Sequence, residues 1–257
     1  MPVTKEQERA ELHRSIWQIA NDLRGSVDGW DFKQYVLGIL FYRFISENLT
    51  NYINDNERRA GHPGFDYTQL ADEQAELGRA ETVREKGFYI LPSELFVNVL
   101  EKAHAATNSS PEPSLLDPEP PSDRFELNVE LARIFRNVEA SATGTESEDD
   151  LKGLFDDLDV NSNKLGPTVA KRNARLTKLL TAISQLKLGN YADNTIDAFG
   201  DAYEYLMAMY ASNAGKSGGE YYTPPRSQRA PRGDYDGPED GGEQSLRPLL
   251  RLGLSPA

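Results

Sequence analysis

The sequence predicts a mainly α-helical protein, built as an irregular N-terminal helical bundle over about residues 8–212. Apolar residues recur at spacings of three and four in several long segments, which is the repeat of one face of an α-helix. Segments rich in proline, glycine or acidic residues separate these stretches, as loops do. Four or five long helices of this kind bury their apolar faces by packing on one another, so a bundle is the expected architecture.

The first helix is expected to start near residue 12 and to stop at Gly25. Its apolar stripe consists of Leu12, Ile16, Ile19, Ala20 and Leu23. We expect Trp17, beside this stripe, and Trp30 to pack in the core or at its rim, because aromatic side chains contribute large buried areas. The next segment, residues 31–49, is apolar around nearly its whole circumference, which predicts a central buried helix.

The middle of the chain is more polar and predicts shorter elements. Residues 68–78 and 81–86 are expected to form short helices, and Ser93 is a suitable N-cap for a helix that runs to about residue 105. The proline-rich run at residues 108–122 predicts a loop. Further helices are expected at residues 123–138, 150–158, 168–188 and 196–210. In the last of these we expect apolar surface to be exposed at Phe199, Leu206 and Tyr210.

The composition limits the possible functions. The chain has 257 residues, with 41 acidic and 28 basic side chains and a formal charge of −13, so on average it repels duplex DNA. It has no cysteine and only three histidines without clustered carboxylates, and we expect no metal site. The polar N-terminal residues and the lack of a long apolar run indicate neither a signal peptide nor a membrane span, which predicts a cytoplasmic protein.

Few motifs could carry chemistry. Gly215-Lys216-Ser217 is not a phosphate-binding loop, because Tyr210 occupies the position of the glycine that such a loop requires. No nucleophile elbow or dinucleotide fingerprint is present, and we expect no catalytic residue in this chain. What remains is a glycine hinge at Gly218-Gly219 that leads into an extended aromatic segment ending in proline.

Several ordered blocks of residues carry a resemblance to a known family. The blocks are Asn21-Asp22-Leu23-Arg24-Gly25, Val27-Asp28-Gly29-Trp30-Asp31-Phe32-Lys33, Leu40-Phe41-Tyr42-Arg43-Phe44-Ile45-Ser46-Glu47, Leu151-Lys152-Gly153-Leu154-Phe155, Leu188-Gly189, Gly200-Asp201-Ala202-Tyr203-Glu204-Tyr205-Leu206 and Gly219-Glu220-Tyr221-Tyr222-Thr223-Pro224. Over about residues 8–225 the chain resembles the modification subunit of type I restriction-modification systems.

The resemblance implies an adenine-N6 DNA methyltransferase subunit that uses S-adenosylmethionine. Its expected partners are a specificity subunit, a second modification subunit, a restriction subunit and double-stranded DNA. In that family the aromatic segment opens the catalytic domain and lines the cofactor pocket. The residues that this implies as cofactor contacts are Glu220, Tyr221, Tyr222, Thr223, Pro224 and Pro225. Local basic residues of the helical domain could help to bind DNA, namely Arg24, Lys33, Arg43, Lys171, Arg172 and Arg175.

The resemblance also predicts a domain organisation. Residues 8–160 are expected to form the N-terminal helical domain, and residues 161–225 the helical connection and the start of the methyltransferase domain. The Rossmann-like catalytic domain is missing: neither the Asp-Pro-x-x-Gly-Ser-Gly cofactor motif nor the Asn-Pro-Pro-aromatic motif that holds a flipped adenine occurs in the sequence. Residues 226–257 are expected to be an aberrant, disordered tail.

The composition of this tail suggests a change of reading frame. It holds five arginines and five acidic residues among many glycines and prolines, without periodicity. Read one base later, residues 240–254 are compatible with codons for Thr-Glu-Val-Asn-Lys-Val-Tyr-Asp-Pro-Cys-Cys-Gly-Ser-Gly-Ser, which contains the missing cofactor motif. A frameshift between about Thr223 and Asp240 is therefore the hypothesis for this tail.

Two readings of the function remain open. In the first, the chain is the N-terminal portion of a modification methyltransferase and is inactive by itself. In the second, it is a non-catalytic helical interaction module that binds the specificity subunit and DNA, or else the product of a pseudogene.

Overall fold

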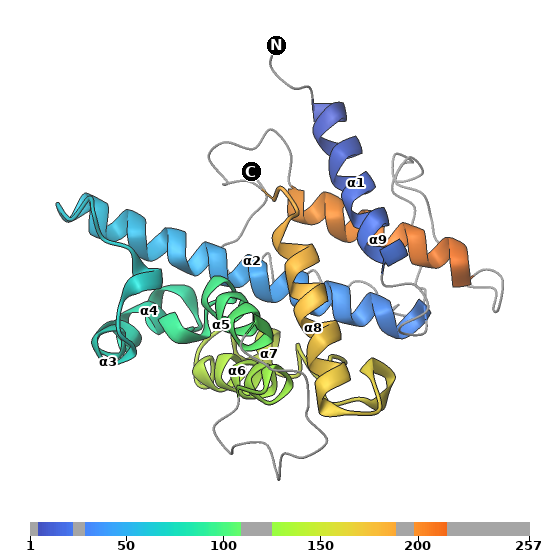
Figure 1. Ribbon diagram of the computed structural model, residues 1–257. Coiled ribbons are helices and arrows are strands. Elements are labelled where there is room, and N and C mark those ends of the chain that lie inside the picture. Colours follow the sequence, from blue (N-terminus) through green and yellow to red (C-terminus); the bar gives the residue numbers. More distant parts are fainter. Residues whose placement is uncertain (1–4, 23–28, 109–124, 189–197, 215–257) are drawn as a thin grey trace, which may run out of the picture. The chain divides into compact units, whose positions relative to one another are not determined.

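The computed structural model describes residues 5–22, 29–108, 125–188 and 198–214, and these residues contain helices and turns but no strand. The long helices are α1 (Lys5–Asp22), α2 (Gly29–Arg59), α5 (Phe96–Asn108), α6 (Leu127–Ser141), α8 (Val169–Ser184) and α9 (Ala198–Ala214) (Figure 1). Shorter helices are α3 (Asp72–Ala75), α4 (Arg79–Lys86) and α7 (Glu148–Leu151). The predicted fold class, mainly α with a helical bundle, is confirmed.

Two units can be distinguished among the described residues. The first comprises residues 5–16, 187–188 and 198–214, and the second comprises residues 17–22, 29–108 and 125–186. The boundary falls inside α1, so the first half of this helix belongs to one unit and its end to the other. No described helix is long and apolar enough to cross a membrane.

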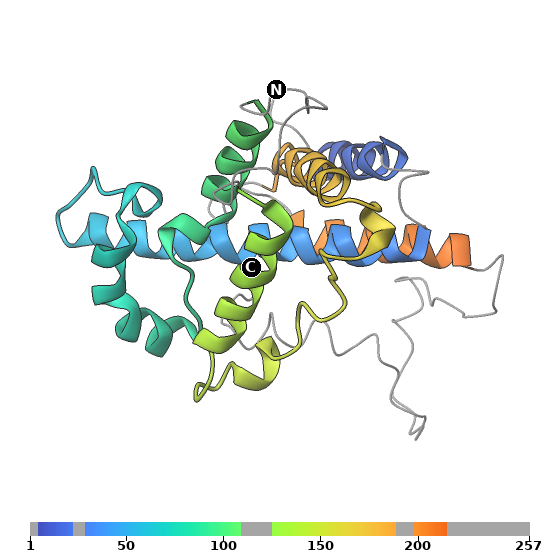
Figure 2. The ribbon, with the colours of Figure 1, turned by 60° about the horizontal axis from the view of Figure 1, so that its bottom comes forward.

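The second unit is built around α2. Its buried side chains lie on all sides of the helix, as the apolar pattern predicted, and include Tyr35, Val36, Ile39, Leu40, Tyr42, Phe44, Ile45 and Leu49. Helix α8 crosses α2 and also packs against α5 and α6 (Figure 1). The short helices α3 and α4 gather near the C-terminal half of α2 (Figure 2).

Helix α2 continues ten residues beyond its predicted end. The apolar pattern stops at Leu49, but the polar residues that follow remain helical to Arg59. This extension is held from the side: the ammonium group of Lys86 lies 4.1 Å from the ring centroid of Tyr52, and the Asn54 side chain accepts a hydrogen bond from the backbone N–H of Tyr67. Tertiary contacts therefore stabilise nearly three helical turns that periodicity cannot predict.

Other predictions about local structure were wrong. Ser93 does not cap a helix: it lies in a 3-10 turn, Pro92–Glu94, and α5 starts at Phe96. Trp17 is 50% exposed and not part of the core, because α1 turns its buried stripe, Leu12, Ile16 and Ile19, away from it. Phe199 and Leu206 are buried rather than exposed, and the Tyr210 and Trp30 side chains lie outside the described residues.

Candidate functional site

The predicted cofactor segment follows α9. Its residues, Glu220, Tyr221, Tyr222, Thr223, Pro224 and Pro225, lie outside the described residues, so their role stays a prediction. Helix α9 ends at Ala214 and is the last described element before this segment. The part of the candidate site that can be examined is thus the helix that leads into it and the surfaces of the helical bundle.

Helix α9 is held by α1 within the first unit. The guanidinium Nε of Arg9 lies 2.7 Å from a carboxylate oxygen of Asp201, and the ring of His13 stacks on Tyr205 with centroids 4.1 Å apart. Burial lowers the pKa of His13 and Arg9 lowers it further, whereas the negative charge of Asp201 opposes this shift. The neutral imidazole is therefore favoured in the stacked arrangement.

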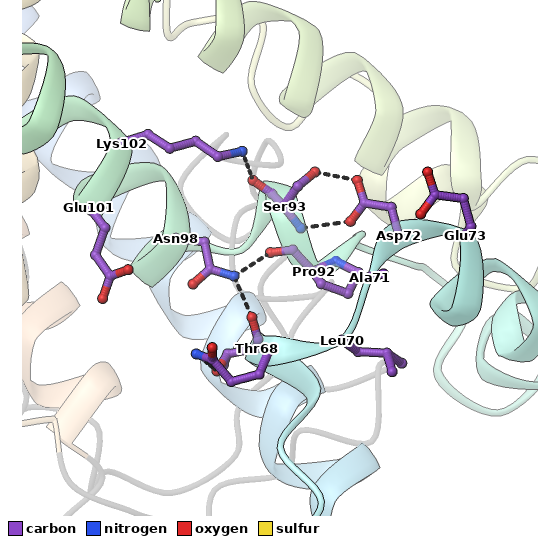
Figure 3. A pocket seen from close by; sticks show the side chains of 11 residues that line it. Thr68, Leu70, Ala71, Asp72, Glu73, Pro92, Ser93, Asn98, Glu101 and Lys102 are labelled. Carbon is purple, nitrogen blue, oxygen red and sulfur yellow. Dashed lines mark hydrogen bonds between the residues drawn. The ribbon is translucent and has the colours of Figure 1, made fainter.

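A polar hollow of about 500 Å³ lies on the second unit (Figure 3). Its lining residues are Thr68, Gln69, Leu70, Ala71, Asp72, Glu73, Pro92, Ser93, Asn98, Glu101 and Lys102. The Asp72 carboxylate accepts hydrogen bonds from both the backbone N–H and the hydroxyl of Ser93, at 2.9 and 2.6 Å. The Asn98 amide donates to the carbonyl oxygens of Thr68 and Pro92, and the Lys102 ammonium donates to that of Ser93.

These bonds join short segments to one another rather than leaving groups aimed at a ligand. These side-chain hydrogen bonds pair backbone groups of the turns at residues 67–72 and 92–95. In a regular helix such backbone groups would pair with one another. Among the residues that the structure describes, no group of three or more acidic or histidine side chains could hold a metal ion. The hollow therefore has the chemistry of a structural junction, and no sequence pattern predicted it.

A buried acidic side chain follows the lining residue Ser93 in the sequence. Glu94 is 2% exposed, and its carboxylate accepts hydrogen bonds from Arg133 at 2.5 Å and from Asn137 at 2.7 Å. The hydrogen bond to Glu130, together with the charges of Glu130 and Glu94, raises the pKa of Arg133 despite its partial burial. A buried carboxylate that is paired and hydrogen-bonded in this way fixes α6 against the turn before α5.

The basic residues proposed for DNA contact differ in their surroundings. Arg43 is 9% exposed, and its guanidinium donates to the carbonyl oxygens of Ile183 and Leu186 at 2.5 and 2.8 Å. The prediction that Arg43 binds DNA is therefore wrong, because its guanidinium is hydrogen-bonded to carbonyl groups at the C-terminal end of α8 that would otherwise lack partners. The side chains of Arg24 and Lys33 lie outside the described residues.

On α8, two arginines are also used internally. Arg172 donates to the carbonyl oxygen of Gly166 at 3.2 Å, and Arg175 donates to that of Leu165 at 2.7 Å. The side chains of Lys171 and Lys178 are exposed. Helix α8 carries four basic residues and no acidic one, so it is a local basic surface in an acidic chain.

The described residues thus form two helical units, and α9, in the first unit, is the last element that the structure describes. Comparison with known proteins agrees with this class. A family model described as the HsdM N-terminal domain matches residues 12–183, and one described as N-6 DNA Methylase matches residues 194–229.

Individual relatives give the same result. The chain is 43% identical over 228 residues to the type I restriction enzyme MpnII methylase subunit of Mycoplasma pneumoniae, covering 87% of this chain and 39% of that protein. It is 23% identical over 216 residues to the MjaIX methylase subunit of Methanocaldococcus jannaschii, covering 83% of this chain and 33% of that protein. The chain belongs to the family of type I restriction-modification methylase subunits.

A solved structure shares the fold. The crystal structure of the type I restriction-modification system methyltransferase subunit from Streptococcus thermophilus superposes with a TM-score of 0.62 at 24% identity. The match covers 84% of this chain and 41% of that structure. The chain therefore spans about two fifths or less of the lengths of the proteins that it matches.

Proposed function

We propose that this chain is the N-terminal portion of an adenine-N6 DNA methyltransferase subunit that works with S-adenosylmethionine in a type I restriction-modification complex. The observation that carries the proposal is the 43% identity to a methylase subunit over 228 residues, together with the match of residues 194–229 to the N-6 DNA Methylase family model. Its place of action is the cytoplasm, where its DNA substrate lies.

The cofactor contacts that we propose are the segment from Glu220 to Pro225, which falls inside the part matched by the methylase model. Methyl transfer also needs a glycine-rich turn on which the cofactor rests and groups that hold a flipped adenine. The sequence contains neither motif, so the chain alone is proposed to be inactive. We attribute the loss of these motifs to a frameshift between about Thr223 and Asp240.

A methylation assay tests the inactivity of the chain. The purified 257-residue chain is incubated with duplex DNA and S-adenosylmethionine that carries a radiolabelled methyl group. No N6-methyladenine is expected, because the sequence lacks the Asn-Pro-Pro-aromatic motif that would hold the flipped adenine and its amino group. Detection of N6-methyladenine above the level of a protein-free control would refute this part of the proposal.

A second candidate function is a non-catalytic interaction module, and the independent core of the second unit favours it. The helices α2, α5, α6 and α8 pack on one another with buried side chains, so this part has the contacts of a folded domain. We propose that it binds the specificity subunit, a second modification subunit and, within the complex, the restriction subunit. A pull-down with the matched specificity subunit tests this function, and a lack of association would leave the product of a pseudogene.

The basic surface of α8 is the proposed contact with double-stranded DNA. Lys171 and Lys178 are exposed on it, and phosphate contacts need accessible cations. Replacing both lysines by glutamate should weaken DNA binding by the assembled complex and flatten its dependence on salt, because fewer counterions are released. Equal salt slopes for the wild type and the variant would contradict this contact.

A further inference from the structure

The lysine at the end of α4 has an unusual environment. The Lys86 side chain is partly buried, and its ammonium group lies 4.1 Å from the ring centroid of Tyr52 on α2. Across the described parts of the chain, no carboxylate forms an ion pair with this ammonium group and no oxygen accepts a hydrogen bond from it. The face of an aromatic ring attracts a cation, but it supplies no oxygen to the N–H groups.

The acidic side chains next to Lys86 in α4 are bonded to other residues. The Glu85 carboxylate accepts a hydrogen bond from the hydroxyl of Tyr52, and Glu81 is paired with Arg84. Burial lowers the pKa of Lys86, and the negative charge of Glu85 opposes this shift only in part. The neutral amine is the nucleophilic form of lysine, and partial removal from water without an anion favours it.

Three other lysines show the contrast. The ammonium of Lys102 donates to the carbonyl oxygen of Ser93 at 3.0 Å, and that of Lys187 lies 2.7 Å from a carboxylate oxygen of Glu11. The side chain of Lys171 is exposed to water. Acceptors and water both stabilise an ammonium group, whereas the environment of Lys86 replaces water by an aromatic ring.

We propose that Lys86 is an acylation site of this chain, which reacts with acyl phosphates or acyl thioesters. The neutral amine attacks the carbonyl carbon, an amide bond forms, and the bond from that carbon to the phosphate oxygen or thioester sulfur breaks. The leaving group takes the electron pair of the broken bond, and the amine loses its proton to water. Because the side chain is only partly buried, a small reagent can reach the amine.

Acylation at this position has a structural consequence. It removes the charge of Lys86 and with it the attraction to the ring of Tyr52. That contact is one of those that hold the polar end of α2, residues 50–59, from the side. The modification therefore weakens the attachment of this end of α2 to α4.

The first experiment measures the reactivity of each lysine in the 257-residue chain. The purified chain is incubated with acetyl phosphate at mildly basic pH and digested with a protease that cleaves at glutamate, and mass spectrometry follows acetylation of each lysine with time. Lys86 should react about tenfold faster than Lys102, Lys171 and Lys187. A rate for Lys86 at or below the rates of these three lysines would overturn the proposal.

A charge variant tests whether the environment causes this reactivity. Tyr52→Glu replaces the ring by a carboxylate and also frees Glu85, so the ammonium form is stabilised and acetylation of Lys86 should slow about tenfold, with no change at the other lysines. Asn51→Glu is the matched control: Asn51 is exposed on the same helix, about 100° around the axis from Tyr52, and acquires the same charge. Equal effects of the two variants on Lys86, or no effect of Tyr52→Glu, would overturn the proposal.

The second experiment measures hydrogen exchange by mass spectrometry. Lys86→Gln removes the charge as acetylation does, so amides of residues 50–59 should exchange about threefold faster while those of α6 do not change. Lys171→Gln is the matched control, because Lys171 is exposed on α8. Unchanged exchange at residues 50–59, or equal acceleration in α6, would overturn the consequence for α2, while the acetylation rates still decide whether Lys86 is the reactive amine.

Discussion

Arg43 provides the most specific prediction about the helical domain. Its guanidinium lies at the end of α8, where the last carbonyl groups of a helix lack partners, and it donates to Ile183 and Leu186. A net contribution of about 1.5–3 kcal/mol is typical of a hydrogen bond to a charged group. The substitution Arg43→Met keeps the apolar stem and removes these two bonds together with the ion pair that Arg43 Nε forms with Glu47 at 2.6 Å. It also removes the cost of burying the charge, so we expect a loss of about 3 kcal/mol.

Urea unfolding followed by circular dichroism measures this loss. In thermal unfolding the same loss should appear as a decrease in Tm of roughly 6–12 °C, because each kcal/mol corresponds to a few degrees for a chain of this size. Arg136→Met is the matched control, since Arg136 is exposed and donates a hydrogen bond to the carbonyl oxygen of Ala132 in its own helix. A change below about 0.5 kcal/mol for Arg43→Met, the range of ordinary surface substitutions, would refute this account of Arg43.

Three further substitutions or conditions have defined outcomes. Arg133→Met leaves the buried Glu94 with one fewer partner and should lower the free energy of unfolding by about 2 kcal/mol. The loss is smaller than for a fully buried pair because Arg133 is 43% exposed, and an unchanged urea unfolding curve would contradict the prediction. Burial lowers the pKa of His13 below its ordinary value of 6.5 in the folded chain. The contribution of His13 to the contact between α1 and α9 is therefore complete above pH 6.5 and is lost as the pH falls through the folded-state pKa. An NMR titration that gives His13 a pKa at or above 6.5 would contradict this prediction. Gly166→Ala should destabilise the chain by more than about 1 kcal/mol in urea unfolding, because φ of Gly166 is +151° and an added Cβ atom would meet the α8 backbone at 3.2 Å. An unchanged free energy of unfolding would contradict this prediction.

The long helices could be predicted from the sequence because their apolar faces are wide. The pattern in residues 31–49 gave the central helix α2, and the stripe with Leu176, Leu180 and Ile183 gave α8. Burial of these faces dominates the local energetics, so periodicity is sufficient there. Helix ends were less predictable, because α2 beyond Leu49 depends on contacts with residues far away in sequence.

The partners of polar side chains could not be predicted from the sequence. Ser93 looks like a helix cap, but its hydroxyl donates to Asp72, which lies 21 positions earlier. From the sequence, Arg43 is a cation within an otherwise apolar helix and was predicted to contact DNA, yet its guanidinium donates hydrogen bonds to the end of a helix that begins more than a hundred residues later. Such side chains have several possible partners of equal chemistry, and only the tertiary fold selects one.

The candidate cofactor segment was predicted from the blocks of residues that resemble the family, and not from periodicity or clustering of residue types. The aromatic segment from Glu220 to Pro225 has no periodicity or cluster that would mark it as a cofactor site. The family similarity that identified it is confirmed through residue 229, whereas the cofactor contacts themselves stay a prediction. The seating of α1 on α9 had no sequence signal, since its partners are about 190 positions apart.

The most direct test of the account is the nucleotide sequence of the coding DNA from the Tyr222 codon through the stop codon. If the chain is the start of an adenine methyltransferase subunit, translation one base later should give Asp-Pro-Cys-Cys-Gly-Ser-Gly opposite the tail and continue into a strand and helix pattern with an Asn-Pro-Pro-aromatic motif. A different peptide in that frame, or an early stop before the cofactor motif, would contradict the frameshift and leave the tail from Arg226 onward as the protein's own sequence.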